Sequence, residues 1–469
     1  MAQAVTGWRL APLLLAAALF LPKPASAQDL TLQIPAVPSG GWFWSAERDD
    51  YTVRVRRPGG QWQDLYEYKV RVDSDTKSLA TMVFFNSDGP VELSVRKNNG
   101  AVHQVSVRPS SRQVPVRIEG DIAYLTLAGP TKLSVEFDGD RLTNLHVFAG
   151  ALRPEPQAGA GVRIFGPGVH EAGEDRLFHF ASGETVYLAP GAILNGGVMI
   201  EGADDVRLIG NGLIYNAPDH GITINNSREV VIDGPTVVNP SHYSLSCGQS
   251  RGIEVADLKA FSEGSWTDGI DMMACSDVDI DDVFLRNSDD TIAIYAGRKG
   301  FTGDARNITV SNAVLWADIA HPIHLGIHGS VGGQETIEEV TFRNIDVLEH
   351  DENDRDYQGV MAINAGDNNI VRKVLFEDIR VDRVEEGLPF LLRVVFNEKY
   401  SHTPGLGISD VTLRNIQFPE IQDRRALIEG FAADREVSDV RLENVTIGDR
   451  PFTRDDLMIG DHVGAVTIR

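Results

Sequence analysis

A short apolar motif that recurs along the second half of the chain constrains the fold more than any other feature. Each copy has an apolar residue, a spacer, a second apolar residue and then a polar turn. Counted from the first residue of each copy, the intervals are 23, 25, 30, 32, 34, 37 and 29 residues. The copies begin at Val230, Ile253, Val278, Ile308, Val340, Val374, Val411 and Val440.

Repeats of this length and pattern predict stacked coils of β-structure. Each copy supplies inward-facing Val, Ile or Phe on a short strand, followed by an Asn, Asp or Gly that suits a left-handed turn. Stacking lets every strand hydrogen-bond to the strand above and buries a continuous apolar bore. We therefore predict a right-handed parallel β-helix over residues 161–469, in which the longer intervals form protruding loops that carry functional residues.

The region before the repeats has a different pattern. Residues 51–55, 91–95 and 133–137 alternate apolar and polar side chains, and Gly, Pro, Asn and Asp separate such runs. Alternation with period two indicates strands with one wet face. We predict an antiparallel β-sandwich over residues 28–150 and a proline-containing linker over residues 151–160, so the whole chain is all-β.

The first 27 residues have the features of a secretory signal peptide. Arg9 precedes an apolar run at residues 11–21, and Ala-Ser-Ala at residues 25–27 resembles a cleavage site. No later segment supplies the roughly 18 apolar residues that a membrane span needs. We expect a secreted or periplasmic protein that has no membrane partner after the signal is removed.

The chain is strongly acidic. Its 67 Asp and Glu residues against 43 Lys and Arg residues give a formal net charge of −24, and removal of Arg9 and Lys23 with the leader makes it −26. Such a charge repels nucleic acid at long range and disfavours polyanionic substrates. We therefore expect no nucleic-acid partner, and we expect a monomer.

Two cysteines, Cys247 and Cys275, are too few for a disulfide scaffold or a structural zinc site. Export permits a disulfide between neighbouring coils, but two separate buried thiols fit the sequence equally well.

Acidic residues gather in two adjacent coils. Asp268 lies 21 residues before Asp289, which is close to one coil length, and Asp290 follows directly. Stacking would place Asp268 beside Asp289, so that three carboxylates share one patch. Crowded carboxylates can keep one member protonated as an acid beside an ionised base, as glycosidic hydrolysis requires. Because Asp290 shares parity with Ile292, the strand must begin or bend here for both acids to reach solvent.

Three segments resemble the signatures of the polygalacturonase family, glycoside hydrolase family 28. They are Trp-Thr-Asp-Gly at 266–269, Ser-Asp-Asp-Thr-Ile-Ala-Ile at 288–294 and His-Leu-Gly-Ile-His-Gly-Ser at 324–330. This resemblance implies a parallel β-helix enzyme that hydrolyses polysaccharides or oligosaccharides with inversion and needs no metal or organic cofactor.

The sandwich ahead of the helix is more similar to the dextranase family, glycoside hydrolase family 49. The segments that carry this likeness are Ser-Val-Glu-Phe at 134–137, Asn-Leu-His-Val-Phe at 144–148 and Asp-Gly-Ile-Asp-Met at 268–272. The two families share the β-helix and the inverting site with three aspartates.

Carried over by position, the resemblance implies that Asp289 is the general acid and that Asp268 and Asp290 hold and deprotonate the water. It implies that His324 tunes the acid by hydrogen bonding, although His321 and His328 compete for that position.

Aromatic side chains can stack on the apolar faces of sugars. We expect Trp266, beside Asp268, to do so, and we expect His328 and Tyr357 to bind substrate as well. Trp316 and Tyr400 are weaker candidates for stacking.

The sequence also departs from the polygalacturonase pattern. Trp266 stands where that family has Asn, and no later Arg-Ile-Lys segment follows, since residues 360–365 read Val-Met-Ala-Ile-Asn-Ala. The resemblance therefore favours a neutral glycan over polygalacturonate, unless Arg298, Lys299 and Arg393 form a local basic patch.

Two other functions stay open from sequence. One is a polysaccharide lyase on the same fold, which would release an unsaturated product. The other is a carbohydrate-binding β-helix protein whose aspartates only form turns.

Overall fold

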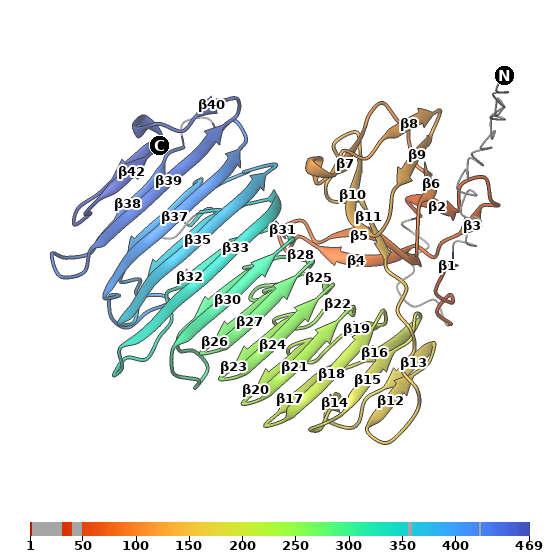
Figure 1. The fold of residues 1–469 in the computed structure, drawn as a ribbon, viewed down its shortest axis with the longest axis horizontal. Coiled ribbons are helices and arrows are strands. Elements are labelled where there is room, and N and C mark those ends of the chain that lie inside the picture. Colours follow the sequence, from red (N-terminus) through yellow and green to blue (C-terminus); the bar gives the residue numbers. More distant parts are fainter. Residues whose placement is uncertain (2–30, 40–48, 355–358, 422–423) are drawn as a thin grey trace.

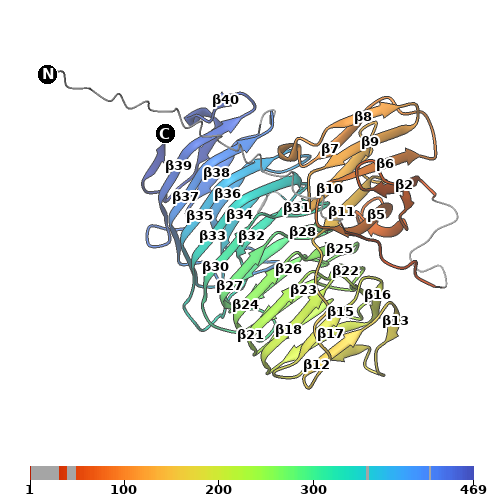
Figure 2. The same cartoon turned by 45° about the vertical axis from the view of Figure 1, so that its right-hand side comes forward.

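The computed structural model describes residue 1 and residues 31–39, 49–354, 359–421 and 424–469. The predicted signal peptide, apart from Met1, and Tyr357 lie outside the described residues. The described chain consists of β-strands and two short 3-10 helices, η1 (Ser110–Arg112) and η2 (Arg454–Asp456). An N-terminal pair of sheets lies beside a long stack of coils (Figures 1 and 2).

The N-terminal sheets face each other across an apolar core that includes Val53, Val55, Leu93 and Leu125. One sheet has the order β3-β2-β6-β9-β8, with strands β2 (Tyr51–Arg56), β3 (Gln63–Asp64), β6 (Val91–Lys97), β8 (Val116–Glu119) and β9 (Ile122–Leu127). The other has the order β1-β5-β11-β10-β7, with β4 beside β5, and contains β1 (Leu32–Gln33), β4 (Tyr68–Val72), β5 (Ser78–Ser87), β7 (Val105–Arg108), β10 (Thr131–Phe137) and β11 (Leu145–Gly150). The strand pairs are antiparallel, as predicted, except for β5 and β11, which pair in parallel.

The remaining strands form the predicted parallel β-helix. An eleven-stranded sheet contains one strand from each coil, in chain order: β14 (Leu177–His179), β17 (Gly197–Glu201), β20 (Ile222–Asn225), β23 (Leu245–Gly248), β26 (Ile270–Met273), β29 (Ile292–Tyr295), β32 (Ile323–Gly326), β34 (Met361–Ala365), β36 (Phe390–Val394), β38 (Ala426–Glu429) and β41 (Leu457–Ile459). We call it the site sheet, because the residues discussed below lie along it.

A twenty-stranded sheet supplies the other walls of the coils. Its strands are β12 (Val162–Phe165), β13 (Gly168–Glu171), β15 (Thr185–Leu188), β16 (Ala192–Asn195), β18 (Asp204–Gly210), β19 (Leu213–Tyr215), β21 (Arg228–Asp233), β22 (Thr236–Val238), β24 (Arg251–Ala256), β25 (Lys259–Phe261), β27 (Ser276–Asp281), β28 (Phe284–Asn287), β30 (Ala305–Ser311), β31 (Val314–Ala317), β33 (Glu335–Glu349), β35 (Asn369–Val381), β37 (Gly407–Phe418), β39 (Val437–Ile447), β40 (Arg450–Pro451) and β42 (Val466–Ile468). In the earlier coils, two strands of each coil belong to this sheet, and each pairs with its own counterpart in the next coil. At β33 one long strand replaces the two, so β33 pairs with both β30 and β31.

The repeat predicted from sequence is confirmed residue by residue. The first residues of the eight copies pair with one another in register, from Val230 with Ile253 to Val411 with Val440. Four residues after each first residue the backbone has a positive φ, which Gly234 adopts freely and which Asp and Asn tolerate. In the seven copies without glycine, φ lies between 50° and 56°, at Asp257, Asp282, Asn312, Asn344, Asp378, Asn415 and Asn444.

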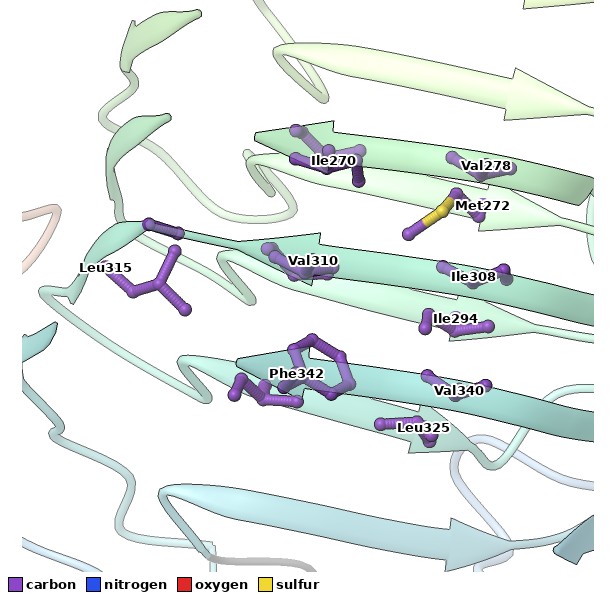
Figure 3. Packing of buried hydrophobic residues seen from close by; sticks show 14 of the residues in the cluster. Ile270, Met272, Val278, Ile294, Ile308, Val310, Leu315, Leu325, Val340 and Phe342 are labelled. Carbon is purple, nitrogen blue, oxygen red and sulfur yellow. The ribbon is translucent and has the colours of Figure 1, made fainter. Parts of the chain in front are cut away.

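The bore of the helix is filled by inward side chains that stack coil upon coil. Ile270, Met272, Ile294 and Leu325 from the site sheet meet residues such as Phe342 from the opposite wall (Figure 3). Cys247 and Cys275 are both in this core, and the structure joins them in a disulfide with their Cα atoms 6.6 Å apart. The question that the sequence left open is thus answered in favour of a bridge between coils.

The sheet that contains β5 and β11 packs on the β-helix through a second apolar cluster, which includes Met82, Phe148, Phe284 and Trp316. Trp316 is 1% exposed, so the expectation that it stacks on sugar is wrong. The sequence around Trp316 cannot reveal this burial, because the residues that cover Trp316 belong to the N-terminal sheets.

Arg286 makes a buried polar contact across this seam. Its side chain is fully buried, pairs with Asp318 at 2.8 Å and lies 3.9 Å from the centre of the Trp316 ring. From the N-terminal sheets it contacts the Asn144 side-chain oxygen at 2.9 Å and the Arg141 carbonyl at 3.0 Å. The seam is therefore joined by a buried charge pair as well as by apolar packing.

Among the described residues, the structure contains no helix with the length and apolar character needed to span a membrane.

Candidate active site

Three successive coils present their turns at the same edge of the site sheet. Ile270, Ile292 and Ile323 pair with one another at the starts of β26, β29 and β32. Two residues earlier in each coil stand Asp268, Asp290 and His321. The prediction that Asp268 lies level with Asp289 is therefore wrong by one residue, because the coil from Ile270 to Ile292 has 22 residues.

The three predicted aspartates nevertheless form one cluster. Asp268, Asp289 and Asp290 each place a carboxylate oxygen within 4.8 Å of the others. Strand β29 begins at Ile292, so Asp289 and Asp290 lie in the turn before it and can both reach the same side. Asp268 is 3% exposed and Asp290 is 5% exposed, whereas Asp289 is partly exposed. A small surface depression lies at this cluster and is lined by Trp266, Asp268, Asp289, Asp290, Tyr295, Arg298, His324, Ile327, His328 and Tyr400.

Asp290 is held by two histidines. Nδ1 of His321 lies 2.7 Å from one carboxylate oxygen, and Nδ1 of His324 lies 2.7 Å from the other. The His321 backbone N–H donates to the first oxygen as well, at 3.1 Å. Burial alone would raise the pKa of Asp290, but these two histidines outweigh it and hold that pKa well below its ordinary value. Asp290 is therefore an ionised carboxylate suited to act as a base.

Asn364 fixes the proton on His324. Its side-chain amide donates to His324 Nε2 at 3.2 Å, so this ring nitrogen accepts and Nδ1 carries the hydrogen. Burial lowers the pKa of His324, although the charge of Asp290 opposes this. The resemblance assigned His324 to the acid, whereas this hydrogen bond runs to Asp290. The sequence did not predict a role for Asn364. The only hint was that Asn364 lies in residues 360–365, the segment where polygalacturonases have Arg-Ile-Lys.

Asp289 has the opposite electrostatics from its neighbour. The backbone N–H groups of Trp266 and Asp290 donate to its two oxygens at 2.9 and 3.1 Å. Burial, followed by the charge of Asp290, raises the pKa of Asp289 to about 7. A carboxyl that keeps its proton at mildly acidic pH and is partly exposed can donate that proton to a bound molecule.

Asp268 is a third, buried carboxyl. Burial, with the charges of Asp271, Asp289 and Asp290, raises its pKa well above the ordinary value. Its Oδ1 atom is buried and has no hydrogen-bond partner among the residues that the structure describes. A water or hydroxyl would reach it only after a small rearrangement of the atoms that cover it. With that rearrangement, the oxygen can orient a water or substrate hydroxyl.

Asp271 and Arg298 form a buried pair beside the cluster that sequence reasoning did not assign. Arg298 Nη1 lies 3.3 Å from Asp271 Oδ2, and its guanidinium carbon lies 4.9 Å from the centre of the Tyr295 ring. Burial raises the pKa of Asp271 to about 7, although Arg298 opposes this. The only hint in the sequence is that Asp271 and Met273 are two residues apart on β26, so their side chains share the outer face of that strand.

The possible basic patch is only partly formed. Lys299 Nζ lies 3.4 Å from Nε2 of both His220 and His242, on the same side as Arg298. Arg393, in contrast, lies one coil beyond Asn364 and pairs with Glu429 at 2.8 Å.

Among the described residues, three groups of side chains have the composition of a metal site: the three aspartates and two groups whose contacts fit a metal poorly. Asp219, His220 and His242 surround the ammonium group of Lys299, which already places a positive charge there. In the group of Asp290 with His321 and His324, both Nδ1 atoms face the carboxylate at hydrogen-bond distance. We keep the prediction that the site needs no metal.

The predicted sugar-binding residues line the depression where they are described. Trp266 is 46% exposed, and its ring centre lies 6.3 Å from that of Tyr400 in an edge-on arrangement. His328 lies 6.4 Å from Tyr400 and 5.0 Å from Tyr295. Burial lowers the pKa of His328 to about 3, so it is a neutral hydrogen-bonding group. Tyr357 remains a prediction.

Comparison with known proteins agrees with this geometry. Residues 191–454 match the family described as glycosyl hydrolases family 28. Isopullulanase of Aspergillus niger is 26% identical over 368 residues, which cover 64% of this chain and 62% of that protein. Exopolygalacturonase clone GBGE184 of Arabidopsis thaliana is 21% identical over 207 residues, covering 43% of this chain and 44% of that protein. The chain thus spans less than two thirds of the length of these curated relatives.

Solved structures share the fold. Dex49A from Penicillium minioluteum has a TM-score of 0.60 at 15% identity, and the match covers 93% of this chain and 96% of that one. An exopolygalacturonase from Thermotoga maritima has a TM-score of 0.50 at 13% identity, covering 66% of this chain and 84% of that one. The resemblance seen in the signature segments is confirmed, and because the family match extends over more than half of its residues, the chain belongs to glycosyl hydrolases family 28.

Proposed function

We propose that this glycoside hydrolase inverts the anomeric centre of a neutral glycan, with Asp289 as the acid and Asp290 as the base. The observation that carries the proposal is the opposite shift of two neighbouring carboxyls. Burial raises the pKa of Asp289 to about 7, whereas two histidines hold that of Asp290 well below its ordinary value. Pairs of carboxyls whose environments separate their pKa values serve as acid and base in glycosidases.

The proposed reaction moves two protons. Asp289 gives its proton to the glycosidic oxygen as the bond from that oxygen to the anomeric carbon breaks. A water held between Asp290 and Asp268 attacks the same carbon from the opposite face, and Asp290 takes the proton that the water loses. Oxygens within 4.8 Å of each other can both accept from a single water, because each hydrogen bond spans roughly 2.8 Å.

Inversion rests on the family resemblance and needs its own test. Inverting enzymes usually separate their carboxyl groups by about 6.5–9.5 Å, and retaining enzymes by about 5–5.5 Å. Here the closest oxygens lie within 4.8 Å, which is nearer to the retaining range. Proton NMR of the first product distinguishes the two: the opposite anomer supports water attack, and the same anomer would mean that a carboxylate attacks instead.

A neutral substrate is supported by the charge balance of the site. Arg298 faces Asp271 rather than standing alone, and the segment at 360–365 supplies no Arg-Ile-Lys. The isopullulanase relative points in the same direction by its name, while the exopolygalacturonase relatives name the competing substrate.

The test is a panel of pullulan, dextran and polygalacturonate, scored by reducing ends and by ultraviolet absorbance. We expect reducing ends from a neutral glucan without new absorbance, since hydrolysis forms no double bond. A strong preference for polygalacturonate would contradict the substrate proposal. An absorbing unsaturated product would identify a lyase, and an unchanged glycan after long incubation would favour a binding protein.

A further inference from the structure

The outer face of the five-stranded N-terminal sheet carries a cluster of aromatic and arginine side chains. Trp62 precedes β3, Tyr124 lies on β9, and their ring centres are 6.3 Å apart with a 46° tilt. The inner face of this sheet packs on the sheet of β5 and β11, which in turn covers the β-helix. The five-stranded sheet lies on the side of the N-terminal region away from the coils (Figures 1 and 2). Because its inner face is covered, the cluster on its outer face is separate from the β-helix and from the aspartates.

A depression of about 200 Å³ opens beside these rings. Its walls include Trp62, Tyr124, Arg117, Glu92 and Thr126. Both aromatic residues are partly exposed, and neither belongs to the apolar core between the sheets. This volume is below the roughly 300–1,000 Å³ of sites that enclose a small molecule, as suits an open surface that contacts only part of a chain. Like such sites, it combines aromatic surface with a few polar groups.

Two arginines hold the rings in place. The guanidinium carbon of Arg56 lies 4.2 Å from the centre of the Trp62 ring, and that of Arg117 lies 4.4 Å from the centre of the Tyr124 ring. Each guanidinium covers one face of its ring and restricts its rotation. Rings that are ordered before a ligand arrives lose little entropy on binding, which favours stacking against a flat, weakly polar partner.

The charges of the cluster are already balanced. Arg56 pairs with Glu92 at 2.6 Å, and Arg117 pairs with Glu119. A uronate carboxylate would have to compete with these glutamates, whereas a neutral sugar can lay its C–H face on a ring and hydrogen-bond to the same polar groups. We propose that this cluster, the sandwich platform, binds a neutral glycan chain separately from the catalytic groove. The ligand class rests on the proposed function, but the site itself does not.

A second binding site would matter only for long substrates. Holding a polymer at two places on one protein raises the effective concentration of the chain at the groove. A short oligosaccharide cannot gain in this way, so loss of the platform should lower kcat/KM on the polymer and leave it unchanged on an oligosaccharide.

The experiment is native electrophoresis of the full protein through gels that contain graded pullulan, dextran or polygalacturonate. We expect a neutral glucan to retard the wild type, and we expect Trp62→Ala and Tyr124→Ala each to need about tenfold more glucan for the same retardation. Phe431→Ala is the matched control, because Phe431 is 46% exposed on the β-helix outside both sites. Circular dichroism of each variant checks that the fold is intact.

Equal retardation of wild type, Trp62→Ala and Tyr124→Ala would overturn the proposal, as would retardation that only Trp266→Ala abolishes. Retardation by polygalacturonate instead of a neutral glucan would overturn the ligand class. If Trp62→Ala loses retardation although no neutral glycan is hydrolysed, the platform stands and the proposed function fails. If a neutral glycan is hydrolysed but Trp62→Ala is retarded normally, the proposed function stands and the platform fails.

Discussion

Replacing Arg286 with Met should destabilise the protein severely. The variant leaves the Asp318 carboxylate, whose side chain is 4% exposed, with the Asp73 backbone N–H as its remaining described donor. Breaking a buried ion pair by removing one partner costs roughly 3–5 kcal/mol. The lost hydrogen bonds to Asn144 and Arg141 add to this, although such terms overlap and do not sum.

The loss should depend on pH. Burial already raises the pKa of Asp318 against the opposing effect of Arg286, and removal of that cation raises it further. A carboxyl whose folded pKa is raised favours the folded state when it is protonated, so stability falls as the pH rises from the unfolded value of about 3.9 through the folded one. We therefore expect Arg286→Met to lose more stability at pH 7.5 than at pH 5.

Urea unfolding followed by tryptophan fluorescence measures the effect, since Trp316 contacts Arg286 directly. Adding Asp318→Asn to Arg286→Met should recover much of the loss, because no buried charge remains. Arg441→Met is the control: its pair with Asp410 is about half exposed, so its loss should change the stability little. A loss below about 1 kcal/mol in Arg286→Met, or a double variant no better than the single, would refute this reasoning.

Three further predictions concern the aspartates. Asp289→Asn should lower kcat by at least roughly 10² to 10⁴, whereas Asp281→Asn at the end of β27 should change it little; near-normal turnover of the first variant would contradict its role as acid. Because Asp289 must be protonated, with a pKa of about 7, kcat should fall as the pH rises above about 7, and a flat profile to pH 9 would contradict the assignment. Asn364→Leu removes the amide that fixes the tautomer of His324, so Asp290 loses a donor worth roughly 1.5–3 kcal/mol and the acid limb of the kcat profile should move up by about one to two pH units. An unmoved acid limb would mean that Asn364 does not control Asp290.

The sequence predicted the fold well because one local rule repeats in every coil. A strand of inward Val, Ile or Phe ends at an Asn, Asp or Gly with left-handed backbone, and both parts can be read from residues such as Val340 and Asn344. The pairing register at the aspartates could not be read in the same way. Turn length decides whether Asp268 meets Asp289 or Asp290, and a shift of one residue leaves the composition unchanged.

Contacts between distant segments account for the remaining differences. Trp316 was a weaker candidate for stacking on sugar, and its burial could not be foreseen because the N-terminal sheets that cover it lie far away in sequence. The partner of His324 depends on where Asp290 stands one coil away, and Asn364 becomes visible only when the next coil is stacked on top. Residue types thus pointed to the groups proposed to react, while their neighbours became visible only in the three-dimensional stack of coils.

The stacking of coils also sets a length scale for the chemistry. Neighbouring strands in a sheet lie about 4.7–4.9 Å apart, and Asp268 and Asp290 occupy equivalent positions on adjacent coils, so backbone hydrogen bonding fixes the distance between the two groups proposed to hold the water. Intervals of 23 to 37 residues between the repeat copies show that added residues leave the coil as loops without altering this pitch. In such a fold the loops that select a sugar can change while the distance between the groups proposed to react stays constant.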